Sequence, residues 1–332
     1  MKKLIVGMII SVLGLYLAFR KVDIHSLGNV LGQAHLGWIL AAVFLLLGSV
    51  WVRALRYRII VLPIKQIRKY PLFANIMIGN FGNNVLPLRL GEILRAYALK
   101  MDEEVSASSA FGTVVVERVV DMVGFLVFLI IIFFWGDIPQ TFSIPGIIIG
   151  ISVILVGIIL WWISKTHQEW IIKFEKLSIF QKKYGQKAIE IIDKFVQGLI
   201  VLRKTKHVSQ ILVITLLLWF IYLMVTFASL KAVHISANGM QAGVLLIATS
   251  LAISIPSAPG FIGTWHVAAV FVLVNIYQQS TDVAQAYAIL NHAINFIPLT
   301  LVGLYYFIKS SVKFREIKKL KIENNSKNLA DE

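Results

Sequence analysis

The chain has 332 residues, of which 58% are hydrophobic and 15% charged, and its mean hydropathy of +0.79 is far above that of a water-soluble domain. It has no cysteine, which excludes disulfides, thiolate metal ligands and cysteine nucleophiles. The formal net charge of +15 comes from Lys and Arg residues that gather in a few segments between apolar runs, so we expect a polytopic membrane protein and no nucleic-acid partner.

Apolar runs long enough to cross a hydrocarbon core of about 30 Å recur along the chain. Six are predicted to be full transmembrane helices: 4–20, 37–58, 106–135, 143–164, 209–230 and 283–308. Basic clusters lie at the N-terminus, at 53–69, at 165–206 and after 309, and the positive-inside rule places them in the cytoplasm. The sequence therefore predicts a multi-pass protein of the cell (plasma) membrane with both termini cytoplasmic.

Two further stretches begin and end on one side of the membrane: 70–100 on the cytoplasmic side and 241–278 on the outer side. Each half of the second stretch has about 15 residues, which as helix span roughly 22 Å, less than the hydrocarbon core. Each stretch is therefore predicted to be a re-entrant helical hairpin. The predicted turns, "NFGNNVLP" and "PSAPGFIG", contain the proline and glycine that interrupt helices.

Irregular backbone at membrane depth is tolerated only where protein buries it or where it lines a wet cavity, so the two turns are predicted to meet inside the bundle. The predicted fold is all-α, with about six transmembrane helices and two re-entrant hairpins entering from opposite faces, or about eight membrane segments. Inverted-repeat transporters bind their substrates between such elements. We predict one membrane domain (1–310) with a cytoplasmic amphipathic loop (165–207), and a polar cytoplasmic tail (311–332).

The first hairpin carries candidate binding residues. Residues 87–100 are predicted to form a half-helix whose N-terminus points to the bilayer centre and favours an anion. Arg89 lies at that end, and a buried guanidinium matches a phosphate or carboxylate. Asn80, Asn83 and Asn84 can supply further donors. Together these residues predict a site for an anionic headgroup, with Arg89 as the main phosphate contact.

Two readings of the neighbouring charges stay open. Glu92 either orients Arg89 or pairs with a cationic part of a substrate; the alternative is an internal Arg89 to Glu92 ion pair, with the asparagines capping broken helix ends. Arg95 lies on the same arm and belongs to the predicted site.

The segment "VVVERVVDMVGF" places Glu117, Arg118 and Asp121 within a predicted span. At mid-depth they could relay a proton or balance the charge of Arg89. Alternatively, because 30 residues exceed one crossing, the helix begins outside the membrane and these charges lie at the interface.

The second turn adds Ser257, Pro259, Gly260, Gly263 and His266 to the candidate site. Asn291, His292 and Asn295 recur at helical spacing on the last span and could face it. A histidine there either exchanges a proton during a cycle or is a hydrogen-bonded packing residue. No metal-ligand spacing, hydrolase motif or phosphate-binding loop occurs in the sequence, so we expect no cofactor and no recognisable enzyme activity.

The stretches "GNNVLPLRLGEILRAYAL", "VVVERVVDMVGFL" and "IPSAPGFIGTWHVAAV" resemble, in this order, the flippase-like membrane region of lysylphosphatidylglycerol synthases. The resemblance spans about 5–310. It matches the first motif at Asn84, Pro87, Arg89, Gly91, Glu92 and Arg95, and the second at Glu117, Arg118 and Asp121.

In the full-length synthases this region moves aminoacylated phosphatidylglycerol between leaflets, and some regions of this type are fused to glycosyltransferases that use polyprenyl-phosphate carriers. The resemblance therefore implies a lipid translocase that binds an anionic phospholipid or a polyprenyl-phosphate-linked precursor. Because this chain ends at Glu332, we expect it to lack the aminoacyl-transferase domain. The alternatives are an intramembrane enzyme acting on a lipid phosphate and a non-transporting partner of a cell-envelope synthesis enzyme.

The predicted topology can be tested with single cysteines, since the chain has none of its own. We expect impermeant reagents applied from outside to label cysteines at Gln140 and Asn238, and to label those at Ser178 and Lys318 only after permeabilisation. Exchange of any position between the two sets would contradict the hairpin assignment.

Overall fold

The computed structural model describes residues 2–20, 22–135, 207–255 and 257–312, and this part of the chain contains ten α-helices and no strand. The all-α prediction is confirmed for these residues. The predicted span 143–164, nearly all of the loop 165–207 and nearly all of the tail 311–332 lie outside the described residues.

The helices are α1 (Lys2–Phe19), α2 (Ile24–Gly32), α3 (Leu36–Val61), α4 (Lys69–Val85), α5 (Gly91–Glu103), α6 (Ala107–Trp135), α9 (Val208–Ala232), α10 (Gly239–Ser254), α11 (Thr264–Phe271) and α12 (Thr281–Lys309). Among the described residues, four segments are long and apolar enough to cross a membrane: α3, α9, α12 and Pro259–Ile276. The segment Pro259–Ile276 was expected to be too short for a full crossing. Most of its helical residues lie in the eight-residue α11 and in a five-residue π turn, Val272–Ile276.

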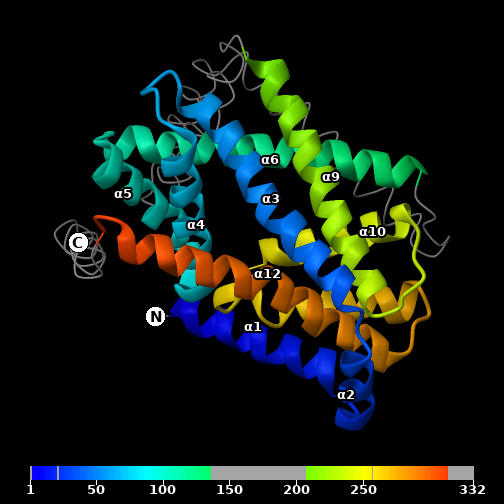
Figure 1. Cartoon of the computed structure of the whole chain (residues 1–332). Helices are drawn as coiled ribbons and strands as arrows, with labels where there is room; N and C mark the ends of the chain where they lie inside the picture. Colours follow the sequence, from blue (N-terminus) through cyan, green and yellow to red (C-terminus); the bar gives the residue numbers. More distant parts are fainter. Residues whose placement is uncertain (1, 21, 136–206, 256, 313–332) are drawn as a thin grey trace, which may run out of the picture.

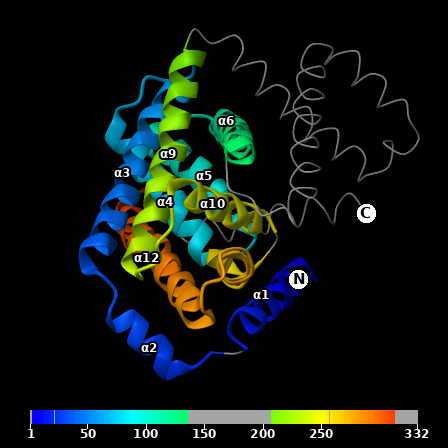
Figure 2. The same cartoon turned by 90° about the vertical axis from the view of Figure 1, so that its right-hand side faces the viewer.

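Helices α3 and α9 form an antiparallel pair (Figures 1 and 2). The N–H of His35, just before α3, donates to the carbonyl of Ala232 at the end of α9 (2.8 Å). Further along the pair, Arg56 Nη1 donates to Thr215 Oγ1 near the start of α9 (3.0 Å). The two ends of this pair give a frame against which the other elements can be placed.

The first broken hairpin, 69–103, consists of α4, a 3₁₀ turn at Pro87–Arg89 and α5, and its two helices pack side by side. Lys65 Nζ, just after α3, donates to the carbonyl of Glu103 at the end of α5 (2.6 Å). Both ends of this hairpin therefore lie at the C-terminal end of α3. The returning helix begins at Gly91 and not at residue 87, because Arg89 has a left-handed backbone (φ 55°) that interrupts the helix.

The second broken hairpin, 239–276, consists of α10, an irregular segment with a 3₁₀ turn at Pro259–Phe261, α11 and the π turn. Tyr277 Oη donates to the carbonyl of Gln241 (3.3 Å), so both ends lie at the C-terminal end of α9, opposite the ends of the first hairpin. Gly263 has φ 98° and packs against α1, where an added Cβ would lie 2.7 Å from Ser11 Cα. Only glycine meets both requirements without strain.

The breaks of the two hairpins contact each other, as the sequence predicts. The Arg89 guanidinium donates to the carbonyl of Ile253 and lies 5.0 Å from the ring centre of Phe261. In the last turn of α4, Asn84 Nδ2 donates to Thr300 Oγ1 of α12 (2.8 Å). Helix α12 packs along α4, so the two breaks meet beside it (Figure 1).

Close packing of α4 on α5 predicts opposite effects for two glycine substitutions. An added Cβ at Gly82 would lie 2.6 Å from Gly91 Cα, whereas nothing lies within 4 Å at Gly48. We expect Gly82→Ala to lower the free energy of unfolding by about 1–3 kcal/mol through overpacking. The control, Gly48→Ala, should be neutral or stabilising because alanine favours helix. Melting temperatures in detergent measure both effects. Equal melting temperatures for Gly82→Ala and Gly48→Ala would contradict the close packing of α4 on α5.

Candidate functional site

Charged side chains from α3, α5 and α6 gather around one buried carboxylate, that of Glu117, which is 0% exposed. Arg95 Nη1 lies 2.6 Å from Glu117 Oε2, and Arg53 Nε donates to Glu117 Oε1. Arg118 and Arg56 approach the same carboxylate at 3.3 and 3.7 Å. A carboxylate at this depth is stable only when it is paired in this way.

Two further carboxylates complete the cluster. Asp121 pairs with Arg56 and, at 3.2 Å, with Arg118. Glu92 pairs with Arg118 at 3.8 Å, and no ion pair joins it to Arg89 among the described residues. The charged cluster is defined as Arg53, Arg56, Glu92, Arg95, Glu117, Arg118 and Asp121. Its four arginines exceed its three carboxylates, which leaves one net positive charge.

The buried arginines of the cluster are fixed by uncharged partners. Arg95, 1% exposed, donates through Nε to Asn75 Oδ1 of α4 (2.9 Å) and lies 3.9 Å from the ring centre of Tyr57. Arg56, 0% exposed, donates to Thr215 of α9. By contrast, 43% of the Arg118 side chain is exposed. Arg118 is therefore the arginine of the cluster most available to a ligand.

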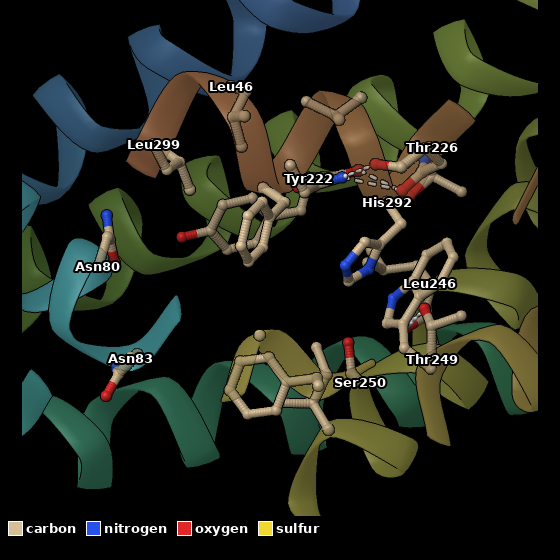
Figure 3. A pocket seen from close by; sticks show the side chains of 18 of the residues that line it. Leu46, Asn80, Asn83, Tyr222, Thr226, Leu246, Thr249, Ser250, His292 and Leu299 are labelled. Carbon is tan, nitrogen blue, oxygen red and sulfur yellow. Dashed lines mark hydrogen bonds between the residues drawn. The ribbon is translucent and has the colours of Figure 1, made fainter. Parts of the chain in front are cut away.

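A cavity of about 400 Å³ lies between the two broken hairpins. Its charged lining residues are Arg53, Arg118 and Asp121. The uncharged polar lining residues are Asn80, Asn83, Asn84, Thr226, Thr249, Ser250, Asn291, His292 and Asn295, and the aromatic ones are Trp219, Tyr222, Phe261, Trp265 and Phe296. In Figure 3, Asn80 and Asn83 face Thr249, Ser250 and His292 across this space. A pocket of this size suits a small ligand or a headgroup.

Two polar atoms of the lining residues are buried and have no hydrogen-bond partner among the described residues: Asn83 Oδ1 and His292 Nε2. Buried polar atoms in native proteins are almost always paired with protein or water. Both atoms are enclosed by the protein, and Asn83 Oδ1 lies against the start of α5, where a Cβ added to Gly91 would be 2.5 Å away from it.

The structure brings part of the predicted site together at this cavity. Asn80, Asn83, Asn84, Arg118, Asp121 and Gly260 line it, together with Asn291, His292 and Asn295. Arg95, Glu117 and Glu92 belong to the charged cluster beside the cavity. Arg89 lies at the contact between the hairpins, where it bonds to one lining residue, Ile253, and covers another, Phe261.

The remaining predicted residues shape the second break. Pro259 begins its 3₁₀ turn, and Gly263 packs against α1. Ser257 Oγ is buried without a partner among the described residues. His266, 5% exposed, accepts from the N–H of Gly263 through Nδ1 (3.4 Å), and its ring centre lies 4.5 Å from that of His292. His266 therefore lies behind a cavity residue.

Arg53 and Arg56 were not predicted as site residues, because they were counted with the basic cluster that sets orientation. A signal was present, because both lie inside the predicted span 37–58, three residues apart in "WVRALRYRII". Arginines on one face of a membrane span normally point to a partner within the protein. Their partners, Glu117 and Asp121, lie on the next predicted span.

The family model described as "Lysylphosphatidylglycerol synthase TM region" matches residues 4–303, which include both broken hairpins and the whole charged cluster. The chain belongs to this family. It is 28% identical over 243 residues to the UPF0104 membrane protein MJ1078 of Methanocaldococcus jannaschii, covering 70% of this chain and 96% of that protein. A solved structure with a significant match was not found.

The chain is also 32% identical over 120 residues to a protein named glycosyltransferase AglD of Haloferax volcanii. This match covers 36% of the present chain and 19% of that relative. The similarity therefore concerns only a small part of the glycosyltransferase.

Neutralising Glu117 should destabilise this family member strongly. Glu117→Gln leaves Arg53 and Arg95 without their carboxylate, and loss of one partner of a buried pair costs about 3–5 kcal/mol. The control Glu104→Gln removes an exposed charge just after α5 and should have little effect. Thermal unfolding in detergent compares them, and equal melting temperatures would show that the cluster does not hold the helices together.

Proposed function

We propose that this membrane protein acts as a lipid translocase that holds an anionic headgroup in the cavity between the two broken hairpins. The headgroup belongs to a phospholipid or to a polyprenyl-phosphate-linked precursor. One observation carries the proposal: a headgroup-sized cavity in an apolar helical protein is lined by the end of α4 in the first hairpin, by the break of the second hairpin and by two arginines, Arg53 and Arg118. Such a site, between discontinuous helices, is where transporters of this general construction bind their substrates.

The charge balance of the cluster favours an anion. Arg53 and Arg95 are occupied by Glu117, and Arg56 by Asp121 and Thr215. Arg118 shares Glu117 and Asp121 with these arginines, pairs with Glu92 at 3.8 Å, and keeps 43% of its side chain exposed. A guanidinium in such a site gives a phosphate two parallel, charge-assisted hydrogen bonds. Arg118 is the headgroup contact in this proposal.

The broken hairpins supply the movement in this proposal. They are re-entrant hairpins that enter from opposite faces of the plasma membrane, among about six full transmembrane helices with both termini cytoplasmic. Exposing the cavity to one leaflet requires the hairpins to separate on that side. Separation breaks the bond between Arg89 and the carbonyl of Ile253, and it frees a guanidinium beside the cavity to follow the phosphate. Arg89 thus keeps a part in headgroup binding.

A second candidate function is that of a non-transporting membrane partner of an envelope-synthesis enzyme. The similarity to part of a protein named as a glycosyltransferase favours it, because a membrane region can serve an enzyme domain carried on the same or another chain. Deleting 165–207 separates the candidates. If the deletion removes a co-purifying enzyme and leaves lipid movement intact, the partner role is supported. If the deletion abolishes lipid movement, transport is supported.

The translocase proposal predicts that Arg118→Gln slows headgroup movement at least about tenfold, since a charge-assisted hydrogen bond contributes about 1.5–3 kcal/mol. Fluorescent phosphatidylglycerol and fluorescent polyprenyl phosphate are reconstituted in vesicles, and their accessibility to an impermeant quencher is followed over time. Arg58→Gln is the control, because Arg58 is exposed near the end of α3 and lies outside the cavity lining. Movement of both lipids by Arg118→Gln at the wild-type rate, with folding intact, would overturn the mechanism.

A further inference from the structure

The cavity contains more polar chemistry than a phosphate needs. A phosphate is an acceptor of hydrogen bonds and is satisfied by arginines and amide donors. Here the arginines are joined by carboxamides from α4 and α12, by hydroxyls from α9 and α10, and by the imidazole of His292. The carboxamide of Asn80 and the hydroxyl of Ser250 can each donate and accept. Groups of this dual kind match a ligand whose own groups are also dual, and hydroxyls are the commonest of these.

The hydrogen bonds that the lining residues already make sharpen the inference. Asn84 donates to Thr300, and Asn295 Nδ2 donates to Asn291 Oδ1 (2.8 Å), so these carboxamides are partly occupied by the protein. The hydroxyls of Thr226 and Thr249 donate to the carbonyls of Tyr222 (3.1 Å) and Leu245 (2.8 Å) in their own helices, so they can only accept from a ligand. Such an acceptor requires a donor. A phosphodiester has no proton to donate at neutral pH, whereas a ligand hydroxyl does.

Aromatic rings form a further part of the cavity surface. Trp219 and Tyr222 come from α9, Phe261 from the second break, Trp265 from α11 and Phe296 from α12. Flat rings next to bonding polar groups suit a cyclic polyol, which presents C–H groups on its faces and hydroxyls at its edge. In Figure 3, Tyr222 lies between the asparagines of α4 and the group of Thr226, Thr249 and His292.

The lining does not suit a cationic headgroup. An aminoacyl group would need an unpaired carboxylate, and Asp121 is the only acidic residue that lines the cavity described here. Asp121 is already paired with Arg56 and Arg118. An ammonium group would also lie beside a cluster with an excess positive charge, which opposes its binding.

We propose, building on the proposed function, that the headgroup is a phosphate ester of an uncharged cyclic polyol, with the phosphate at Arg118 and the polyol among the carboxamides and aromatic rings. The volume of about 400 Å³ limits the polyol to about one ring, because pockets of roughly 300–1,000 Å³ hold whole small ligands. A hexose on a polyprenyl phosphate and the inositol of a phospholipid share this chemistry.

The test measures binding to purified full-length protein in nanodiscs, by native mass spectrometry and by competition. The probes are a short-chain polyprenyl phosphate, its monohexosyl ester, phosphatidylinositol, phosphatidylglycerol and lysylphosphatidylglycerol. We expect the monohexosyl ester or phosphatidylinositol to bind at least about tenfold more tightly than the lipid without the ring, and lysylphosphatidylglycerol to bind least. Whichever of the monohexosyl ester and phosphatidylinositol binds more tightly identifies the source of the polyol.

Amino-acid substitutions test whether the preference for ring-bearing lipids arises in the cavity. Asn80→Ala removes a half-buried carboxamide that lines the cavity, so folding should be unchanged and affinity for the ring-bearing lipid should fall about fivefold, the effect of one hydrogen bond. Affinity for bare polyprenyl phosphate should not change. The matched control is Asn275→Ala, at an exposed residue of the π turn outside the cavity lining.

Equal affinity for lipids with and without the ring, or tighter binding of lysylphosphatidylglycerol, would overturn this inference. The proposed function survives those results if Arg118→Gln still weakens binding and movement of the preferred lipid. Failure of every anionic lipid to bind would instead reject the proposed function itself. An equal loss for the ring-bearing and the bare lipid in Asn80→Ala would place that residue at the phosphate and contradict the assignment of the polyol.

Discussion

The buried carboxylate of Glu117 is the constraint on which the rest of the described structure depends. A fully buried charge is tolerated only with close partners of opposite sign, and here they come from α3, α5 and α6. Because Arg95 sits on the returning arm of the first broken hairpin, its ion pair also fixes the position of that hairpin. Helix α4 follows through the hydrogen bonds between Asn75 and Arg95, and α9 through the bond between Arg56 and Thr215. One carboxylate thereby positions the wall of the cavity.

The same cluster separates structural from ligand-directed charge on neighbouring residues of α6. Glu117 points into the protein and takes most of the pairing capacity of Arg53 and Arg95. Arg118, the next residue, points toward the cavity and remains partly exposed. Successive residues of a helix face different directions, so an adjacent acid and base can serve packing and binding at once. The excess positive charge of the cluster therefore lies at Arg118, next to the cavity.

Local features of the fold could be predicted from the sequence, and the distant partners of charged residues could not. Proline and glycine mark both breaks, and the alternation of basic clusters requires the first stretch to return to its own side. The start of α5 was misplaced because the left-handed backbone of Arg89 accompanies contacts with Ile253 and Phe261, residues far away in the sequence. Arg53 and Arg56 were assigned to orientation because their carboxylates lie more than 60 residues further along the chain.

The two hairpins give the cavity different chemistry. The first contributes asparagines at the end of α4, whereas the second contributes Gly260 and Phe261 at its break. Arg89 joins the hairpins through Ile253 and Phe261, which both line the cavity. In the proposed function, a headgroup in the cavity would therefore contact the residues that hold the hairpins together. A ligand shifts a conformational equilibrium only by its differential affinity for the two states. In the proposed translocase, the contacts that would supply such a difference belong to the wall of the cavity itself, so ligand binding and hairpin separation would be coupled directly, without a longer chain of residues between them.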